Sequence, residues 1–249
     1  MNTKRIDLLG SSLNCLTMQE TLIVVDEIIK KRIPTQHVVV NASKINLMSK
    51  DEKLRVIINE CPLINADGQS IVWAGRFLGF FIPERVTGID LFTELVKKAS
   101  TEGLRLYYIG SEEEVIQEVI RLHRKQYPSL IVAGFRNGYF KEEEEAKIVR
   151  EIHQSQPDIL FVAFSSPKKE YWINKYKEQL NIPFMMGVGG SFDVVAGKTK
   201  RAPNWMQIVG LEWFYRLIQE PKRMFSRYVK GNTKFIITVI KAKIRRNGV

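Results

Sequence analysis

The segment DILFVAF (158–164) decides the fold of this chain of 249 residues. It is a near-continuous apolar run, which is typical of a strand that helices cover on both faces. Five similar runs are HVVVNA (37–42), CPLINA (61–66), LRLYYIG (104–110), LIVAGF (130–135) and IPFMMGVGG (182–190). Helical patterns separate them, so the sequence predicts an α/β protein, a three-layer Rossmann-like domain with a mainly parallel sheet.

Polar residues predict where several helices begin. TMQE (17–20) is a capping box that opens a helix to about residue 31, and SKDE (49–52) and SEEE (111–114) open two more. EEEE (142–145) fits the acidic first turn of another helix. These helices fall between the expected strands, as the three-layer fold requires.

The positive charge of the chain is concentrated at its carboxyl end. The net charge is +11, yet residues 1–193 hold 25 Lys and Arg against 25 Asp and Glu, whereas residues 194–249 hold 13 against 2. We therefore expect an α/β catalytic domain over residues 1–197 and a basic helical appendage over residues 198–249. Asn204 is expected to cap a helix that runs to about Glu220, with Pro221 ending it and Gly231 interrupting the next segment.

The appendage mixes aromatic and cationic residues, which is typical of helices that lie flat on an anionic membrane. A helix packed on the domain with its basic face in water, a protein partner and nucleic acid are the alternatives. Its apolar and amphipathic residues are Trp213, Phe214, Leu217, Met224, Phe225, Tyr228, Phe235, Ile236 and Ile240.

Several classes of protein are disfavoured. No stretch approaches the roughly 20 apolar residues of a membrane span, and no secretory signal is visible, so we expect a cytosolic protein. Cys15 and Cys61 are expected to be free thiols, and the three scattered histidines predict no zinc site. There is neither a GxGxxG nor a GxxxxGK[ST] motif, so no nicotinamide cofactor or P-loop is predicted.

Ligands of open parallel sheets bind where the strands end. The residues at those ends are Asn41, Asp67–Gly68, Gly110–Ser111, Ser165–Ser166 and Gly187–Gly190. The glycines at 187, 189 and 190 allow a ligand to approach the backbone closely. Gly110 serves either a phosphate site or a tight turn.

Four side chains near these ends each have two interpretations. Asp67 is either a general base or the cap of a helix that begins near Gln69, with even weight on both. Arg85 binds a phosphate or pairs with an acid at the surface. Lys169 attracts a diphosphate or belongs to a solvated basic turn, and Tyr139 stacks on a base or fills a gap beside Gly138.

Several segments, in order and spacing, resemble the WecG/TagA/CpsF glycosyltransferases, family 26 of the carbohydrate enzymes. They are NADGQSIVW, PERVTGIDL, GYF, PDILFVAFSSPKKEYW and GVGGSFDVVAGKTKRAPNWMQIVGLEWFYRLIQEPKR, within residues 8–230. The resemblance implies an inverting, metal-independent transfer of a sugar from a UDP-sugar to a polyprenyl-diphosphate-linked sugar, in exopolysaccharide, teichoic-acid or related glycan synthesis. It also implies a protein that is peripheral on the inner face of the cytoplasmic membrane.

The resemblance also assigns roles to residues. Asp67 matches the acid of the DG motif that deprotonates the acceptor, Asn41 lies near the active site, and Arg85 contacts the diphosphate. Tyr139 and Asp193 match positions that line the nucleotide pocket, and the strand-end glycines Gly110, Gly187, Gly189 and Gly190 are placed there with them. Arg216, Arg223 and Arg227 are our candidates for contacts to lipid phosphates or the acceptor diphosphate.

This chain departs from the family pattern at two positions. Val39 stands where many members have threonine, and Lys169 where many have glutamine. We therefore do not carry over N-acetylmannosamine as the donor. We expect no cofactor, no metal and no nucleic-acid partner, and homo-oligomerisation is left open. The rival hypotheses are a non-catalytic membrane- or nucleic-acid-binding protein with a basic tail, and a nucleotide-sugar-modifying enzyme.

Overall fold

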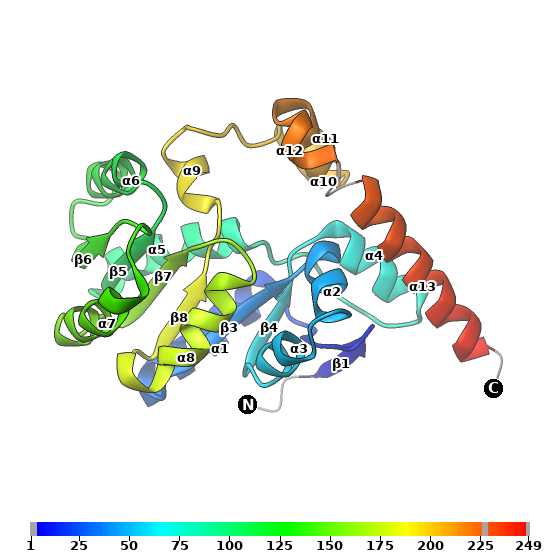
Figure 1. Ribbon diagram of the computed structural model, residues 1–249, viewed down its shortest axis with the longest axis horizontal. Helices are drawn as coiled ribbons and strands as arrows, with labels where there is room; N and C mark the ends of the chain where they lie inside the picture. Colours follow the sequence, from blue (N-terminus) through cyan, green and yellow to red (C-terminus); the bar gives the residue numbers. More distant parts are fainter. Residues whose placement is uncertain (1–3, 226–228, 248–249) are drawn as a thin grey trace.

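The fold is a parallel sheet between two layers of helices, as the apolar runs predict. The computed structural model describes residues 4–225 and 229–247, without the side chains of Arg223, Met224 and Asn247. The six strands are parallel, in the order β4-β3-β8-β7-β5-β6 (Figure 1). Their bounds are Thr35–Val40 (β3), Leu63–Ala66 (β4), Arg105–Gly110 (β5), Ile131–Arg136 (β6), Ile159–Ala163 (β7) and Phe184–Gly187 (β8).

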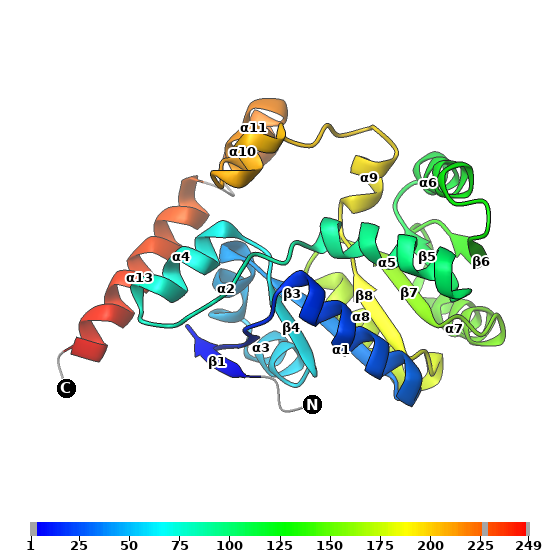
Figure 2. The ribbon, with the colours of Figure 1, turned by 180° about the vertical axis from the view of Figure 1, so that it is seen from behind.

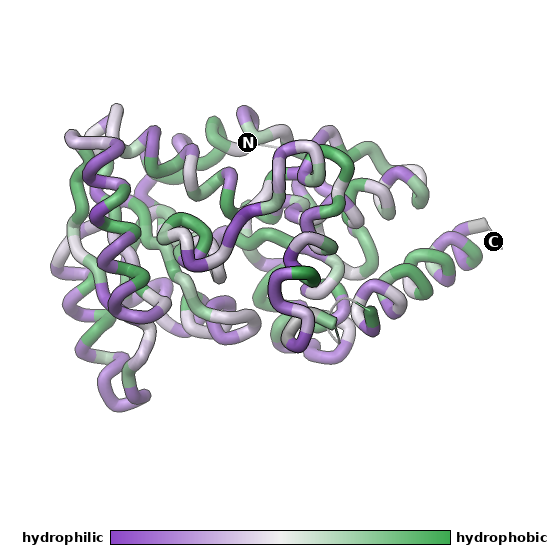
Figure 3. Tube along the Cα trace, turned by 90° about the horizontal axis from the view of Figure 1, so that it is seen from above, coloured by the Kyte–Doolittle hydropathy of each residue, from purple (hydrophilic) through white to green (hydrophobic). Residues whose placement is uncertain are grey.

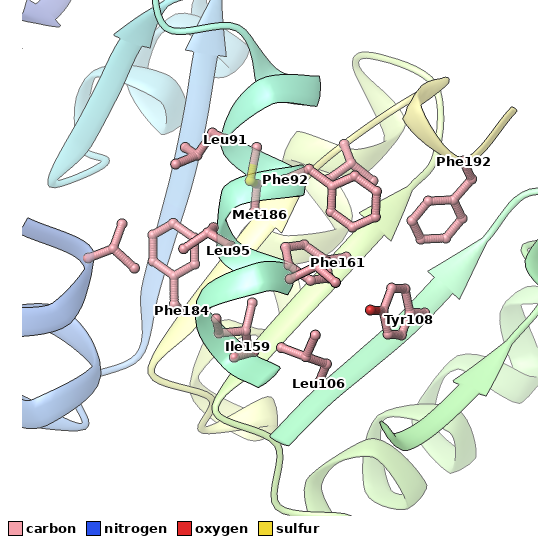
Figure 4. Close-up of a cluster of buried hydrophobic side chains, with 14 of the residues drawn as sticks. Leu91, Phe92, Leu95, Leu106, Tyr108, Ile159, Phe161, Phe184, Met186 and Phe192 are labelled. Atoms are coloured by element: carbon pink, nitrogen blue, oxygen red, sulfur yellow. The ribbon is translucent and has the colours of Figure 1, made fainter. Parts of the chain in front are cut away.

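One face of the sheet is covered by α1 (Met18–Lys31), α5 (Gly88–Glu102) and α6 (Glu113–Gln126). Figure 2 shows α1 and α5 crossing the sheet on this side. Aromatic rings fill the space between the layers. The ring centres of Phe92 in α5 and Phe161 in β7 lie 4.6 Å apart, edge to face, and Tyr108 packs beside them (Figure 4). Burial of these large rings is a main source of stability here.

The opposite face is covered by two pairs of helices. These are α2 (Ala42–Met48) with α3 (Glu52–Asn59), and α7 (Glu145–Gln154) with α8 (Lys168–Leu180). The 142–145 segment begins with the turn η1 (Glu142–Glu144) and leads into α7, as the acidic run predicts. Because the six strands of this sheet are all parallel, their carboxyl ends meet at one edge, with α4 (Gln69–Phe77) and α9 (Ser191–Val195) following β4 and β8 there.

An antiparallel hairpin, β1 (Arg5–Leu8) and β2 (Ser11–Asn14), was not predicted. Its strands are short and alternate polar with apolar residues, so they lack the continuous apolar run used to find the others. The Asn14 side chain accepts a hydrogen bond of 2.8 Å from the backbone of Ile64 in β4. The hairpin thereby covers the outer edge of the sheet, which would otherwise be open to pairing.

Two of the three predicted capping boxes are wrong. Thr17 and Glu20 do form one at the start of α1. Asp51, however, caps α3 by accepting from the backbone of Leu54, and α6 begins without a side-chain cap. Ser111 has a positive φ of 58°, and its hydroxyl turns to Asp193 instead.

The single helix predicted from Asn204 to Glu220 is two helices, α10 (Asn204–Ile208) and α11 (Glu212–Gln219). The chain turns between them at Gly210, whose φ is +74°. A Cβ at Gly210 would lie 2.8 Å from the Gln69 side chain, so only glycine fits this turn against α4. Pro221 begins the short helix α12 (Pro221–Phe225), and Gly231 begins α13 (Gly231–Asn247) rather than interrupting a helix.

The last helix packs on the α/β body. Figure 1 shows α13 running beside α2 and α4, and Phe235 and Val239 are buried in the cluster that α2, α3 and the hairpin form with β3 and β4. The side-chain amide of Asn46 in α2 donates a hydrogen bond of 2.7 Å to the Gly231 carbonyl. The other face of α13 exposes isoleucines, and the hydropathy colours alternate along it (Figure 3). The boundary near residue 197 and a separate appendage stay predictions.

Candidate active site

Asp67 lies at the carboxyl edge of the sheet, directly after β4. Its Oδ1 accepts a hydrogen bond of 2.9 Å from the backbone N–H of Gly88, the first residue of α5. Its Oδ2 accepts one of 3.0 Å from the Asn41 side chain. α4 begins after Gly68 with no side-chain cap, so the alternative in which Asp67 caps that helix is wrong. The carboxylate is half-buried, oriented from two sides, and retains lone pairs for a further proton donor.

Asn41 fixes this geometry because both ends of its amide are engaged. Its Oδ1 accepts from the backbone of Lys44 at 3.1 Å and caps α2, and its Nδ2 donates to Asp67. Val39, two residues earlier, points under the start of α5. A Cβ added to Gly88 would lie 3.4 Å from the Val39 side chain.

A buried ionic cluster lies beside the ends of β3, β7 and β8. Lys44 of α2 donates to Glu170 Oε1 at 2.5 Å, and Lys169 lies 3.4 Å from the same oxygen. The Ser166 hydroxyl donates a hydrogen bond of 2.9 Å to Glu170 and accepts one of 2.7 Å from Lys169. Two ammonium groups therefore share one carboxylate, and the cluster carries one positive charge in excess.

Burial and neighbouring charges shift the pKa values in this cluster. Burial, reinforced by the charge of Lys44, lowers the pKa of Lys169 to about 8, although Glu170 and Asp67 oppose the shift. Burial acts to raise the pKa of Glu170, but the two lysines outweigh it and hold that pKa at about 2. An excess buried cation at the carboxyl edge of the sheet suits the binding of an anionic group.

The glycines after β8 make room for the Lys169 side chain. A Cβ at Gly187 would lie 2.5 Å from Lys169 Cδ, and Gly189, with a φ of +55°, lies near the ammonium group. Gly190 precedes the first turn of α9. The lysine stem therefore crosses the end of β8, and the glycine run brings backbone N–H groups and an ammonium group to the same place.

Three of the predicted nucleotide-binding residues are brought together at the end of β5. Gly110 has a φ of +123°, and a Cβ there would lie 2.7 Å from the backbone of Ala163. The Ser111 hydroxyl donates 3.3 Å to Asp193 of α9, and its carbonyl accepts from Gly138 N–H. Tyr139 follows with 74% of its surface exposed, so the alternative that it fills a gap is wrong.

Arg85 connects the body to the appendage. Val86, the next residue, donates its backbone N–H to the carbonyl of Ala66 at the end of β4. The backbone at Arg85 therefore lies near Asp67, which follows Ala66. The guanidinium lies 3.3 Å from Glu212 of α11, and Arg216 lies 3.3 Å from the other oxygen of that carboxylate. Two predicted substrate-binding arginines thus meet at one acid. The Arg223 side chain and Arg227 lie outside the described residues.

Sequence reasoning missed Lys44, Glu170 and Glu212. Lys44 offered a signal: it lies in the α2 stripe with Ala42, Ile45 and Met48, which is otherwise apolar, and a charge there requires a buried partner. Glu170 could not be paired with it because 126 residues separate the two in sequence.

Two features are absent from the described ranges, 4–225 and 229–247. No group of three or more His, Cys, Asp or Glu side chains there could hold a metal ion. Among those residues no helix is both long and apolar enough to cross a bilayer.

Comparison with known proteins identifies the family. Residues 6–248 match the Glycosyl transferase WecG/TagA/CpsF family, and the chain belongs to this family. It is 33% identical over 192 residues to an N-acetylglucosaminyldiphosphoundecaprenol N-acetyl-beta-D-mannosaminyltransferase of Bacillus spizizenii, covering 77% of this chain and 73% of that protein. A Bacillus subtilis (strain 168) protein of the same name is 34% identical over 195 residues, with the same coverage. The resemblance predicted from the motifs is confirmed, and an enzyme is favoured over a non-catalytic binding protein.

Proposed function

We propose that this chain transfers an N-acetylhexosamine from a UDP-sugar to a sugar linked to polyprenyl diphosphate, in the synthesis of a cell-surface glycan. The names of the two Bacillus relatives support N-acetylmannosamine as the first donor sugar to test and N-acetylglucosaminyl-diphosphoundecaprenol as the first acceptor. Val39 and Lys169 set this chain apart from many relatives, so the donor panel includes other N-acetylhexosamines.

The observation that carries the proposal is the placement of Asp67. A carboxylate that is half-buried at the ligand-binding edge and oriented by Asn41 and Gly88 is suited to accept a proton from an acceptor hydroxyl. As that proton moves to Asp67, the hydroxyl oxygen forms a bond to the anomeric carbon of the donor. The bond from that carbon to the diphosphate oxygen breaks, UDP leaves, and the anomeric configuration inverts.

Negative charge develops on the leaving UDP. The part of the site formed by Lys169 and the glycines after β8 is suited to stabilise that charge. The Lys169 ammonium group and the glycine-rich turn after β8, which lie next to each other, would face the diphosphate. The nucleoside would lie toward the β5 end, where Tyr139 offers an exposed ring and Asp193 a carboxylate. Arg85 and Arg216 would meet the diphosphate of the acceptor.

The acceptor's location supports peripheral attachment to the inner face of the cytoplasmic membrane. A polyprenyl chain stays in the bilayer, so the enzyme has to reach the interface. α10 and α11 expose Trp205, Ile208 and Phe214, and the exposed lysines Lys200 and Lys222 flank the two helices in the chain, which suits contact with an anionic membrane surface.

The test is transfer by purified protein with a panel of UDP-N-acetylhexosamines and N-acetylglucosaminyl-diphosphoundecaprenol, in EDTA, followed by mass spectrometry. We expect an acceptor that gains one sugar, and at least a hundredfold loss of rate in Asp67→Asn. Asp7→Asn is a matched control, because Asp7 also accepts a backbone N–H, from Gly10 at 3.0 Å, but lies at the hairpin. Full activity in Asp67→Asn, or no product with any donor, would contradict the proposal.

A further inference from the structure

An exposed aromatic face on α4 has no role in the chemistry described above. Trp73 and Phe77 expose 52% of their surface each, and Phe81, just beyond the helix, exposes 70%. We call these three residues the α4 aromatic face. Trp73 and Phe77 are four residues apart and so lie on one stripe of the helix. The buried side of α4, with Ile71 and Val72, already packs on the core.

The α4 aromatic face begins at Trp73, six residues after Asp67, and meets the appendage. α4 begins two residues after Asp67, and at about 1.5 Å per residue its stripe leads away from the acid toward Phe77. The turn at Gly210 packs directly on it, since a Cβ at Gly210 would lie 3.1 Å from the Trp73 ring. Beyond that contact, α10 and the residue that follows it expose three more large apolar residues: Trp205, Ile208 and Val209.

Cations border the α4 aromatic face. Lys243 Nζ lies 5.6 Å from the centre of the Phe77 ring, and the Arg246 guanidinium lies 4.4 Å from that of Phe80. Arg246 also donates to the carbonyl of Leu78 at the end of α4. Arg76, within the helix, is exposed beside Phe77. These cations border the end of the strip that lies farther from Asp67, where they would face anionic lipid headgroups as the polyprenyl chain enters the bilayer.

We propose that the α4 aromatic face holds the first part of the polyprenyl chain of the acceptor, guiding it from the site at Asp67 toward the bilayer. This inference rests on the proposed function, because it needs a lipid-linked acceptor. With a diphosphate near Arg85 and an acceptor sugar at Asp67, Trp73 and Phe77 offer the lipid an exposed apolar surface on the helix that begins beside the site. A second copy of the chain fits less well, because a symmetric contact here would bring the cations of both α13 helices together.

The experiment compares a long and a short acceptor. Wild type and the double variant Trp73→Ser/Phe77→Ser are assayed with two acceptors. The long one is N-acetylglucosaminyl-diphosphoundecaprenol in mixed micelles, and the short one is an analogue in buffer that has the same sugar and diphosphate on a short alkyl chain. We expect kcat/KM on the long acceptor to fall at least tenfold, about 1.4 kcal/mol, and kcat/KM on the short one to change less than twofold. Ile23→Ser, an exposed apolar residue of α1, is the matched control and should change neither.

Each other outcome overturns the proposal. An equal loss on both acceptors would mean that the variant damages the site or the fold. A parallel loss of binding to acceptor-free vesicles of anionic phospholipid would show that the face binds the bilayer itself, and a change in sedimentation from oligomer to monomer would show a protein contact. Failure of the proposed function looks different, because wild type would then use neither acceptor.

Discussion

Asn41 and Asp67, which follow neighbouring strands, are joined by a hydrogen bond of 3.0 Å from the amide to the carboxylate. The other end of the same amide caps α2. One side chain thus links the start of a helix to the orientation of the proposed base, and the two duties can be separated by substitution.

We predict that Asn41→Asp keeps the fold and loses activity. Aspartate caps helices as well as asparagine does, so the melting temperature should change by no more than a few degrees. The new carboxylate cannot donate to Asp67, and two neighbouring carboxylates resist ionising together. We expect the transfer rate to fall at least tenfold, with partial recovery at higher pH. Unchanged activity would show that Asn41 serves only the helix.

A second prediction concerns pH. Burial lowers the pKa of Lys169 to about 8, so its ammonium group loses its charge as the pH rises through about 8. If this charge stabilises the leaving diphosphate, kcat should fall over that range. Lys169→Arg should remove this decline because arginine stays charged. Lys169→Gln should be slower and lack the decline as well. A decline that persists in both variants would assign it to another group.

The same shift has a consequence for stability. The pKa of Lys169 in the folded state lies below its ordinary value of 10.5. Between about pH 8 and 10.5 the unfolded chain therefore binds the extra proton, and the contribution of Lys169 to the free energy of unfolding rises with pH. The free energy of unfolding, measured with denaturant and plotted against pH, should rise more steeply in wild type than in Lys169→Gln over this window.

The parallel sheet was predictable because its strands are buried on both faces and therefore appear in the sequence as apolar runs. β1 and β2 were missed for the opposite reason, since short strands at an edge need no such run. Asp67 and Asn41 were found because strand ends converge in this topology. The Lys44–Glu170 pair could not be found in the same way, because it depends on α2 and α8 lying side by side after 126 intervening residues.

The break between α10 and α11 shows a different limit. Gly210 follows the C-cap of α10 with a φ of +74°, the left-handed conformation in which glycine commonly ends a helix, so the sequence held a local signal that the prediction of one helix through 204–220 did not use. The contact of this turn with α4 could not be read from the sequence. Arg85 likewise had two interpretations that the sequence could not separate, because its partner Glu212 lies in the appendage.

Glu212 holds two predicted acceptor-binding arginines, and we predict that it competes with the diphosphate. Glu212→Gln removes the negative charge that Arg85 and Arg216 share. We expect the KM for the lipid-linked acceptor to fall several-fold while the KM for the donor stays constant. Glu178→Gln, at an exposed position of α8, is the control. A higher acceptor KM would instead show that Glu212 is needed to hold the arginines in place.

The packing of α13 supplies the last prediction, which tests whether residues 198–249 form a separate appendage. Phe235 is 4% exposed and belongs to the same buried cluster as residues of β3 and β4. Phe235→Ala should therefore lower the free energy of unfolding of the whole protein by about 3–5 kcal/mol. Ile244→Ala, at a position on the same helix that is 65% exposed, should change it by less than about 0.5 kcal/mol. The measurement is denaturant unfolding followed by far-ultraviolet circular dichroism. If Phe235→Ala melts α13 alone and leaves the main transition in place, the last helix is a detachable element rather than part of the α/β core.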